Sequence, residues 1–236
     1  MKASRAGTTP SYSNMPRLPN GKVPIAAFTA LLISAFAVLA QQSAQRTVKI
    51  LILGDSLTEG LGVEKEDAFP AKLDGMLRKW RDGVQVVNGG SSGSTSASGL
   101  RRLKWYEKAK PDLVLLALGS NDGLRGVKVE ETRKNVEAAL LFCQSKHWQV
   151  VLAGLKVPPN YGAEYAGAFE KIYPELAAKY KVPIVKFLLE GVAGEPGMNQ
   201  ADGIHPNERG HERIAENLFR FFQPLLSGAT GKPAPG

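Results

Sequence analysis

Three residues of the sequence have the side chains that nucleophilic acyl transfer requires. Ser56 follows an apolar run in the segment Gly54-Asp55-Ser56-Leu57, and Asp202 and His205 lie three residues apart near the C-terminus. A serine hydroxyl becomes a strong nucleophile when a base removes its proton, and histidine, with an ordinary pKa of about 6.5, suits that role near neutral pH. A nearby carboxylate can hold the imidazole in one tautomer. These residues predict a serine hydrolase with Ser56 as nucleophile, His205 as base and Asp202 as its orienting carboxylate.

The same chemistry needs hydrogen-bond donors for the oxyanion of the tetrahedral intermediate. The backbone amides of Ser56 and Gly93 and the carboxamide of Asn121 are the candidates. Glycine at position 93 lets the backbone approach a ligand without a side chain in the way. We therefore expect an oxyanion hole made by Ser56, Gly93 and Asn121.

These residues need a fold that gathers distant segments, and the apolar pattern predicts one. Short runs rich in Val, Ile and Leu alternate with amphipathic stretches, which is typical of buried parallel strands connected by helices. The runs are 48–53, 84–87, 113–118, 150–155 and 182–188, and the helical stretches are about 68–81, 97–109, 130–146, 164–180 and 206–223. The alternation predicts one three-layer α/β domain with about five parallel strands. The candidate residues follow the ends of predicted strands, where folds of this class bind ligands. Pro206 is expected at the first position of the last helix.

Four segments in this order resemble the four blocks of the SGNH (GDSL-type) hydrolase family. They are Gly54-Asp55-Ser56-Leu57, Gly93, Gly119-Ser120-Asn121-Asp122 and Asp202-x-x-His205. A closer resemblance, to the bacterial arylesterase and multifunctional acyl-thioesterase/lysophospholipase branch, rests on longer segments. These are Asn121-Asp122-Gly123-Leu124-Arg125-Gly126, Pro159-Asn160-Tyr161-Gly162, Ile172-Tyr173-Pro174 and Asp202-Gly203-Ile204-His205-Pro206-Asn207, and the resemblance covers about residues 47–226.

The resemblance implies a flavodoxin-like sheet of strand order 2-1-3-4-5 and a Ser-Asp-His triad that works without metal or cofactor. It also implies that a mobile loop after Asn121, here Gly123, Leu124, Arg125 and Gly126, positions acyl chains in the site. The sequence departs from the branch at Ser94, which follows Gly93 and where aspartate is common. This departure concerns the rigidity of the loop that carries Gly93 and Ser94, and not the triad.

Two competing sites need to be weighed against this one. Ser91 lies in a Gly-x-Ser-x-Gly segment, the pattern of the α/β-hydrolase nucleophile elbow, but only one predicted strand precedes it, so we favour Ser56. His205 and His211, with Asp202 nearby, could be read as metal ligands, but no second histidine completes a zinc motif. We expect no metal site and interpret His211 and His147 as packing or surface residues.

The pI of about 9.5 raises the question of nucleic-acid binding. Trp105 and Tyr106 lie among the cations Arg101, Arg102, Lys104, Lys108 and Lys110. No nucleic-acid motif accompanies them, so we expect a solvated helix face with a partly buried aromatic pair. The single cysteine, Cys143, lies on an apolar helical stripe and is expected to be buried; it also excludes an internal disulfide.

The net charge of +8 is concentrated at the N-terminus, because no Asp or Glu precedes Asp55. Residues 1–22 are basic and residues 23–40 are apolar, which predicts a signal peptide cleaved after Ala40, with an uncleaved anchor or a start at Met15 as alternatives. Export to the periplasm or medium is expected. Residues 41–46 are interpreted as a linker, 47–226 as the hydrolase domain and 227–236 as a disordered tail. Without residues 1–40 the chain carries 26 basic and 22 acidic residues, so its net charge is +4.

The sequence therefore predicts an exported, monomeric serine hydrolase that cleaves small-molecule carboxylic esters. The resemblance extends this expectation to acyl thioesters and lysophospholipids, with transient contact to a membrane surface. A carbohydrate O-deacetylase on the same scaffold is the alternative, and acyl-chain length distinguishes the two. A non-catalytic, membrane-anchored binding module is a third hypothesis, which the complete set of candidate catalytic residues disfavours.

Overall fold

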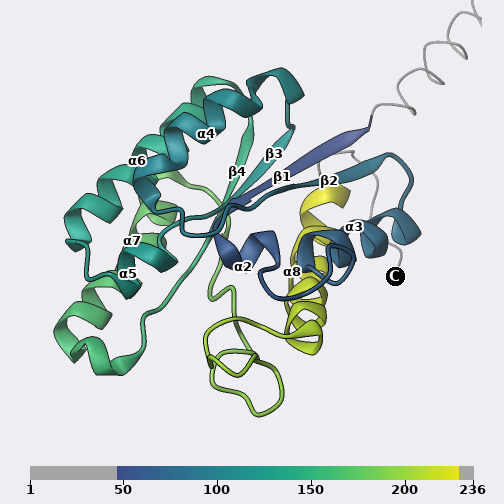
Figure 1. Ribbon diagram of the computed structural model, residues 1–236. Coiled ribbons are helices and arrows are strands. Elements are labelled where there is room, and N and C mark those ends of the chain that lie inside the picture. The colour runs from purple at the N-terminus through teal and green to yellow at the C-terminus, as the bar shows by residue number, and fades with distance from the viewer. Residues whose placement is uncertain (1–46, 229–236) are drawn as a thin grey trace, which may run out of the picture. The chain divides into compact units, whose positions relative to one another are not determined.

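A five-stranded sheet forms the centre of residues 47–228, the part of the chain that the computed structural model describes (Figure 1). Its strands are β1 (Val48–Gly54), β2 (Val84–Gly89), β3 (Leu113–Ala117), β4 (Gln149–Ala153) and β5 (Ile184–Val185). The strand order is β2-β1-β3-β4-β5, and all neighbours are parallel. In register, Ile50 of β1 pairs with Val86 on one side and Leu113 on the other. The predicted α/β class and strand order are confirmed.

Helices cover both faces of this sheet. The longer ones are α3 (Phe69–Trp80), α4 (Gly99–Tyr106), α6 (Val129–Ser145), α7 (Ala163–Tyr180) and α8 (Glu208–Gly228). Figure 1 shows α3 and α8 on one side of the sheet and α4, α6 and α7 on the other. The short helices α2 (Ser56–Glu59) and α5 (Ser120–Leu124) follow β1 and β3, and 3-10 turns span Ser96–Ser98, Glu107–Ala109 and Pro159–Tyr161. None of the helices in residues 47–228 has the length and apolar character needed to cross a bilayer.

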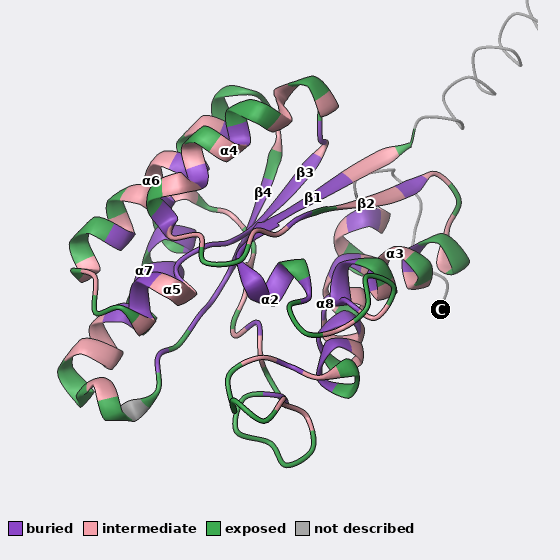
Figure 2. Cartoon of the chain, viewed as in Figure 1, coloured by how far each residue is buried: buried purple, intermediate pink, exposed green. Residues whose placement is uncertain are grey.

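The core lies between the sheet and its two helical layers, as the buried strand positions in Figure 2 show. Ile50 to Leu53 of β1 are at most 1% exposed, and so are Leu113 to Leu116 of β3. Because both faces of these strands are covered, their side chains are apolar without alternation. Cys143 of α6 is buried in this core as predicted, and burial raises the pKa of its thiol to about 12. Among residues 47–228, the buried apolar residues run from Ile50 to Leu226 and pack into one core.

Two elements end differently from the prediction. β5 contains only Ile184 and Val185, because the chain leaves the ladder and the Leu188 amide donates to the carbonyl of Gly154. α8 continues through Pro224 to Gly228, beyond the predicted end at 223 and two residues into the expected tail. Leu226 is 2% exposed and its carbonyl accepts from Arg81, contacts that hold the last turn in place. The predicted signal peptide, the linker and the remaining tail lie outside the described residues.

The start of α8 corrects another expectation. Pro206 does not occupy the first helical position; it forms an isolated bridge with Asn199, and α8 begins at Glu208. The side-chain oxygen of Asn207 accepts from the amides of Arg209 and Gly210, at 3.0 and 3.1 Å, and so caps the helix. His205 therefore lies in a bridged loop before the helix.

The aromatic pair at the end of α4 also differs from the prediction. Trp105 is 79% exposed, so the expected partial burial is wrong for this residue. Arg102, expected on the solvated face, is half-buried and donates to the carbonyl of Gly89, while Leu103 supplies the helix's contact with the core.

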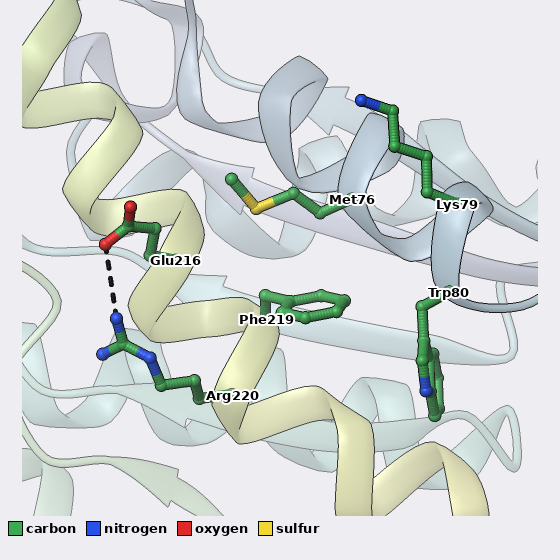
Figure 3. A pocket seen from close by; sticks show the side chains of 6 residues that line it. All are labelled: Met76, Lys79, Trp80, Glu216, Phe219 and Arg220. Atoms are coloured by element: carbon green, nitrogen blue, oxygen red, sulfur yellow. Dashed lines mark hydrogen bonds and ion pairs between the residues drawn. The ribbon is translucent and has the colours of Figure 1, made fainter.

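A hollow lies between α3 and α8 (Figure 3). It is lined by Met76, Lys79, Trp80, Glu216, Phe219 and Arg220. Trp80 and Phe219 meet edge to face with ring centroids 6.3 Å apart. None of the residues predicted to be catalytic lines this hollow.

Candidate active site

Ser56 is held at the carboxyl end of β1 by a capped turn. A carboxylate oxygen of Asp55 accepts from the Leu57 amide at 3.1 Å and caps α2, so that Ser56 is the first residue of this four-residue helix. Gly54 precedes the turn, where a Cβ atom would lie 2.0 Å from Thr58 Oγ1. Burial raises the pKa of Asp55. The turn leaves Ser56 only 8% exposed, with its hydroxyl directed toward His205.

A chain of two hydrogen bonds joins Ser56, His205 and Asp202. Ser56 Oγ lies 2.9 Å from His205 Nε2, and His205 Nδ1 lies 2.6 Å from Asp202 Oδ2. The other Asp202 oxygen accepts from the amides of His205 and Ile204, at 3.0 and 2.9 Å. The hydrogen bond from the His205 ring, followed by those two amides, lowers the pKa of Asp202 to about 2. Because an ionised carboxylate only accepts, Nδ1 carries the proton and Nε2 presents its lone pair to the Ser56 hydroxyl.

The loop that carries this pair is fixed by Gln200. The Gln200 amide donates to the carbonyl of His205 at 2.8 Å, and its side chain donates to the carbonyls of Pro206 and Leu61, at 2.9 and 2.7 Å. Leu61 belongs to the loop that follows α2. One side chain therefore connects the His205 loop with the segment that carries Ser56.

The predicted oxyanion donors lie on three neighbouring connections. As the first residue of α2, Ser56 has a backbone N–H that no carbonyl of that helix can accept. Gly93 has a φ of +72°, a conformation that glycine adopts readily, and only the Arg125 side chain lies near its Cβ position, at 3.9 Å. Asn121 Nδ2 donates one hydrogen to the carbonyl of Ser94 at 2.9 Å. That bond fixes the carboxamide next to the Gly93 loop and leaves its second hydrogen without a partner among residues 47–228.

A buried network braces the Gly93 loop against α5. Asp122 accepts from the amide and the hydroxyl of Ser96, at 2.7 and 2.5 Å, and from Thr132 at 3.4 Å. Asn135 in turn donates to the Ser96 hydroxyl at 3.0 Å. Asp122 is 1% exposed and Ser96 is also 1% exposed. The carboxylate next to Asn121 therefore joins the segment that carries Asn121 to the connection that carries Gly93.

The predicted substrate loop, Gly123 to Gly126, is tied at both sides. Tyr161 donates to the carbonyl of Leu124 at 2.9 Å, and Tyr165 donates to that of Val127 at 2.7 Å. Arg125 reaches across to the carbonyl of Gly93 at 3.2 Å and remains exposed. The loop thus lies beside the Gly93 connection.

The competing sites do not form comparable arrangements. Among the hydrogen bonds within residues 47–228, none joins Ser91 to His205. His211 is buried, accepts from the Phe69 amide at 3.2 Å and stacks on its ring, and burial lowers the pKa of His211 to about 4. His147 is exposed at the end of α6, with a φ of +58°. In the described part of the chain, no cluster of three or more His, Cys, Asp or Glu side chains has the arrangement of a metal site.

Sequence reasoning did not find the supporting residues. Gln200 and Ser96 stand outside recognisable motifs, and no spacing rule signals their partners, which are 139 and 26 residues away. Asp122 lies next to Asn121 in the sequence, yet its carboxylate braces the connection after β2.

Comparison with known proteins identifies the family. The family model for the GDSL-like lipase/acylhydrolase family matches residues 52–213. The esterase TesA of Pseudomonas aeruginosa is 40% identical over 201 residues, which cover 84% of this chain and 99% of TesA. Thioesterase 1/protease 1/lysophospholipase L1 of Escherichia coli K12 is 38% identical, with 81% of this chain and 91% of the relative covered.

Solved structures give the same result. The crystal structure of TesA aligns with a TM-score of 0.72 at 39% identity, covering 75% of this chain and 99% of the other. The predicted resemblance is therefore confirmed. The chain belongs to the GDSL-like lipase/acylhydrolase family and is a carboxylic ester hydrolase of that family.

Proposed function

We propose that the protein hydrolyses acyl esters, acyl thioesters and lysophospholipids through a covalent acyl-Ser56 intermediate. The observation that carries this proposal is the continuous hydrogen-bonded chain from Ser56 through His205 to Asp202, with links of 2.9 and 2.6 Å. Two relatives support the range of substrates, since their names include thioesterase, lysophospholipase and esterase.

In the acylation half, Ser56 Oγ forms a bond to the acyl carbon while His205 Nε2 takes the hydroxyl proton. The carbonyl electron pair moves onto the oxygen, which accepts from the amides of Ser56 and Gly93 and from Asn121 Nδ2. When the carbonyl re-forms, the bond to the leaving oxygen or sulfur breaks and His205 returns the proton to it. Asp202 stays ionised throughout, because its pKa is about 2, and it stabilises the imidazolium.

Deacylation repeats these steps with water in place of Ser56 Oγ. His205 Nε2 removes a proton from water as its oxygen attacks the acyl carbon, and then protonates Ser56 Oγ as the carboxylic acid leaves. The same three donors serve both tetrahedral intermediates, which is why their fixed spacing supports both halves of the reaction.

The surroundings of Ser56 favour an acyl chain over a purely polar substrate. Leu61 and Ile204 are 46% and 44% exposed, and both lie on the loops that Gln200 joins beside His205. Exposed apolar side chains at a site entrance gain stability when an acyl chain covers them.

A substrate panel tests the proposal. Purified protein is assayed on p-nitrophenyl esters from about C2 to C16, on lysophosphatidylcholine and on an acyl-CoA, with chain length as the discriminating variable. We expect rates maintained or increased beyond about C4, since a lipid-type pocket gains binding energy with each added methylene. A collapse beyond about C4 would instead support the O-deacetylase alternative.

The nucleophile is tested separately with Ser56→Ala and the matched control Ser91→Ala. A serine-directed phosphonate should add to the wild type and to Ser91→Ala, detected as a mass increase, and should not add to Ser56→Ala. Turnover in Ser56→Ala equal to that of the wild type would exclude Ser56 as the nucleophile.

We also propose that the protein is exported, because basic residues precede the apolar run 23–40 and small residues occupy positions 38 and 40. Cell fractionation with N-terminal sequencing tests this. We expect the enzyme outside the cytoplasm with an N-terminus at Gln41; a cytoplasmic protein that retains residues 1–40 would refute it.

A further inference from the structure

All three tryptophans of the sequence lie near one edge of the sheet, at the amino ends of the strands. Trp80 ends α3 before β2, Trp105 lies in the last turn of α4 before β3, and Trp148 immediately precedes β4. Trp80 packs edge-on against Phe219 and Trp148 against Phe142. Trp105 is 79% exposed, the largest exposed fraction among the large apolar side chains of residues 47–228.

Hydrogen bonds hold the segments of this edge together. Lys49 Nζ donates to the carbonyl of Ala109 at 3.2 Å, Lys146 pairs with Glu107 at 2.5 Å, and the Val48 amide donates to the carbonyl of Gly83 at 2.7 Å. The starts of β1, β2, β3 and β4 therefore lie at one continuous surface, which we call the amino edge. It comprises Trp105 with residues 47–49, 81–83, 107–112, 146–148 and 181–183.

The amino edge carries more basic than acidic residues, whereas the opposite edge of the sheet, which carries Ser56 and is called the catalytic edge, carries more acidic than basic residues. The connections that lead into β2, β3, β4 and β5 contain five Lys or Arg and three Asp or Glu. The connections that leave the strands, residues 55–68, 90–98, 118–128, 154–162 and 186–207, contain five Lys or Arg and nine Asp or Glu. Around Trp105, the cations Lys104, Lys108 and Lys110 are exposed and form no ion pair with any residue from 47 to 228.

The chain also enters the domain at this edge. β1 then runs for seven residues, about 23 Å, before the turn that carries Ser56. The described part of the chain therefore begins at the amino edge, and the edge that carries Ser56 lies at the other end of the sheet.

We propose that the amino edge is a docking surface for an anionic lipid bilayer, with Trp105 inserted at the interface and the surrounding lysines facing lipid phosphates. Exposed tryptophan surrounded by lysine is the composition of membrane-interface surfaces, where the ring enters the headgroup region and each cation is attracted by anionic lipid. Docked in this way, the enzyme directs Ser56 away from the bilayer and remains accessible to dissolved substrate.

Vesicle co-sedimentation tests this docking. The protein used begins at Gln41, the N-terminus expected after cleavage, and the buried apolar residues among residues 47–228 lie between Ile50 and Leu226. The probes are phosphatidylcholine vesicles with and without about 30% phosphatidylglycerol. We expect binding to the anionic vesicles alone, weakened when salt is raised from about 0.05 to 0.5 M, because salt screens surface charge.

Two variants locate the surface. Trp105→Ala should weaken vesicle binding about fivefold, because the variant lacks the ring that the proposal places in the lipid interface. The double variant Lys104→Glu/Lys108→Glu should weaken it by more than about 30-fold, since the loss of each cation near an anionic surface costs about fivefold and each new carboxylate is repelled. The matched controls are Leu141→Ala, an apolar residue 45% exposed on α6, and Lys65→Glu/Lys128→Glu, with two exposed lysines on the catalytic side. Both controls should bind like the wild type.

Several results would overturn the proposal: equal binding to neutral and anionic vesicles, no binding to either, or losses in the control variants as large as those at the amino edge. Binding to a short DNA duplex in place of vesicles, or self-association in sedimentation, would assign the surface to another partner and also overturn it. Hydrolysis of a soluble p-nitrophenyl ester supplies an independent readout of orientation. Turnover of the ester should be unchanged in both amino-edge variants. It should also be unchanged when anionic vesicles bind all the wild-type protein, and a loss of turnover on vesicle binding would contradict an orientation in which Ser56 faces away from the bilayer.

Discussion

Replacing Asp202 by asparagine should impair catalysis more than replacing it by alanine. In the native site, one Asp202 oxygen accepts from the amides of His205 and Ile204, while the other faces His205 Nδ1 at 2.6 Å. In Asp202→Asn, the carboxamide oxygen stays with the two amides, so its NH₂ group faces Nδ1. His205 must then carry its proton on Nε2, and the lone pair that should accept from Ser56 is lost.

The magnitude follows from two contributions. Turning the carboxamide to restore the productive tautomer gives up two backbone hydrogen bonds, about 2 kcal/mol in total. Losing the negative charge beside the imidazolium costs about 1.5 kcal/mol, taking the 2.6 Å separation at a water-like dielectric because the Asp202 side chain is 43% exposed. Asp202→Asn should therefore lose on the order of 10²–10³ in kcat/KM. Asp202→Ala loses the charge and the hydrogen bond from His205 Nδ1, about 2.5 kcal/mol in total, or about 70-fold.

The assay is initial-rate hydrolysis of p-nitrophenyl butyrate, with all variants compared at one pH, about 8. Ser56→Ala supplies the background rate, and thermal unfolding of each variant checks that the fold is intact. If Asp202→Asn retains as much activity as Asp202→Ala, the tautomer argument is wrong and the carboxylate acts through its charge alone.

Three further expectations concern residues around the site. Burial lowers the pKa of His211 from an ordinary 6.5 to about 4, so the unfolded chain binds more protons than the folded protein between these pH values. The contribution of neutral His211 to the free energy of unfolding is therefore complete above about pH 6.5 and is lost as the pH falls toward 4. From pH 7 to 4 the unfolding free energy of the wild type should thus fall about 3 kcal/mol more than that of His211→Gln in urea titrations; parallel curves would contradict this. Asp122→Ala leaves the buried Ser96 amide without its acceptor, and should lower stability by about 2 kcal/mol and kcat about tenfold; an unchanged kcat would separate this network from catalysis. Cys143, whose pKa burial raises to about 12, should resist Ellman's reagent in the native enzyme and react fully in guanidinium chloride, and rapid native labelling would show that it is accessible.

The fold could be predicted from the sequence because the central strands are apolar at every position. β1 and β3 are covered on both faces, and the helices between them have clear amphipathic periods. The short helices α2 and α5 escaped prediction, since four or five residues are too few to show a helical period. β5 was predicted too long because apolar composition does not reveal where an edge strand leaves the ladder.

In the candidate site, too, some residues could be predicted from the sequence and others could not. Ser56, Asp202 and His205 could be predicted because their chemistry demands particular residue types and the parallel topology brings strand ends to one edge. The residues that hold them there, such as Gln200 and Ser96, act through single long-range hydrogen bonds that many polar side chains could make. Residue type and topology therefore predict that Ser56, His205 and Asp202 meet, but they do not predict the residues that hold them in place.

The separation of charge between the two edges has a partial cause in the fold itself. In a sheet of this kind the helices run antiparallel to the strands, so their N-termini point to the catalytic edge and their C-termini to the amino edge. The helix dipole favours acidic residues at the former, such as Glu130 and Glu164 in first turns, and basic residues at the latter, such as Lys79 and Lys104 in last turns. The helix dipole accounts for the placement of charged residues at helix ends, but it does not account for the exposure of the Trp105 side chain. Trp105→Ala is therefore the variant that separates a membrane surface from ordinary helix capping, because only a surface that enters a lipid interface loses affinity when the ring is removed and the lysines remain.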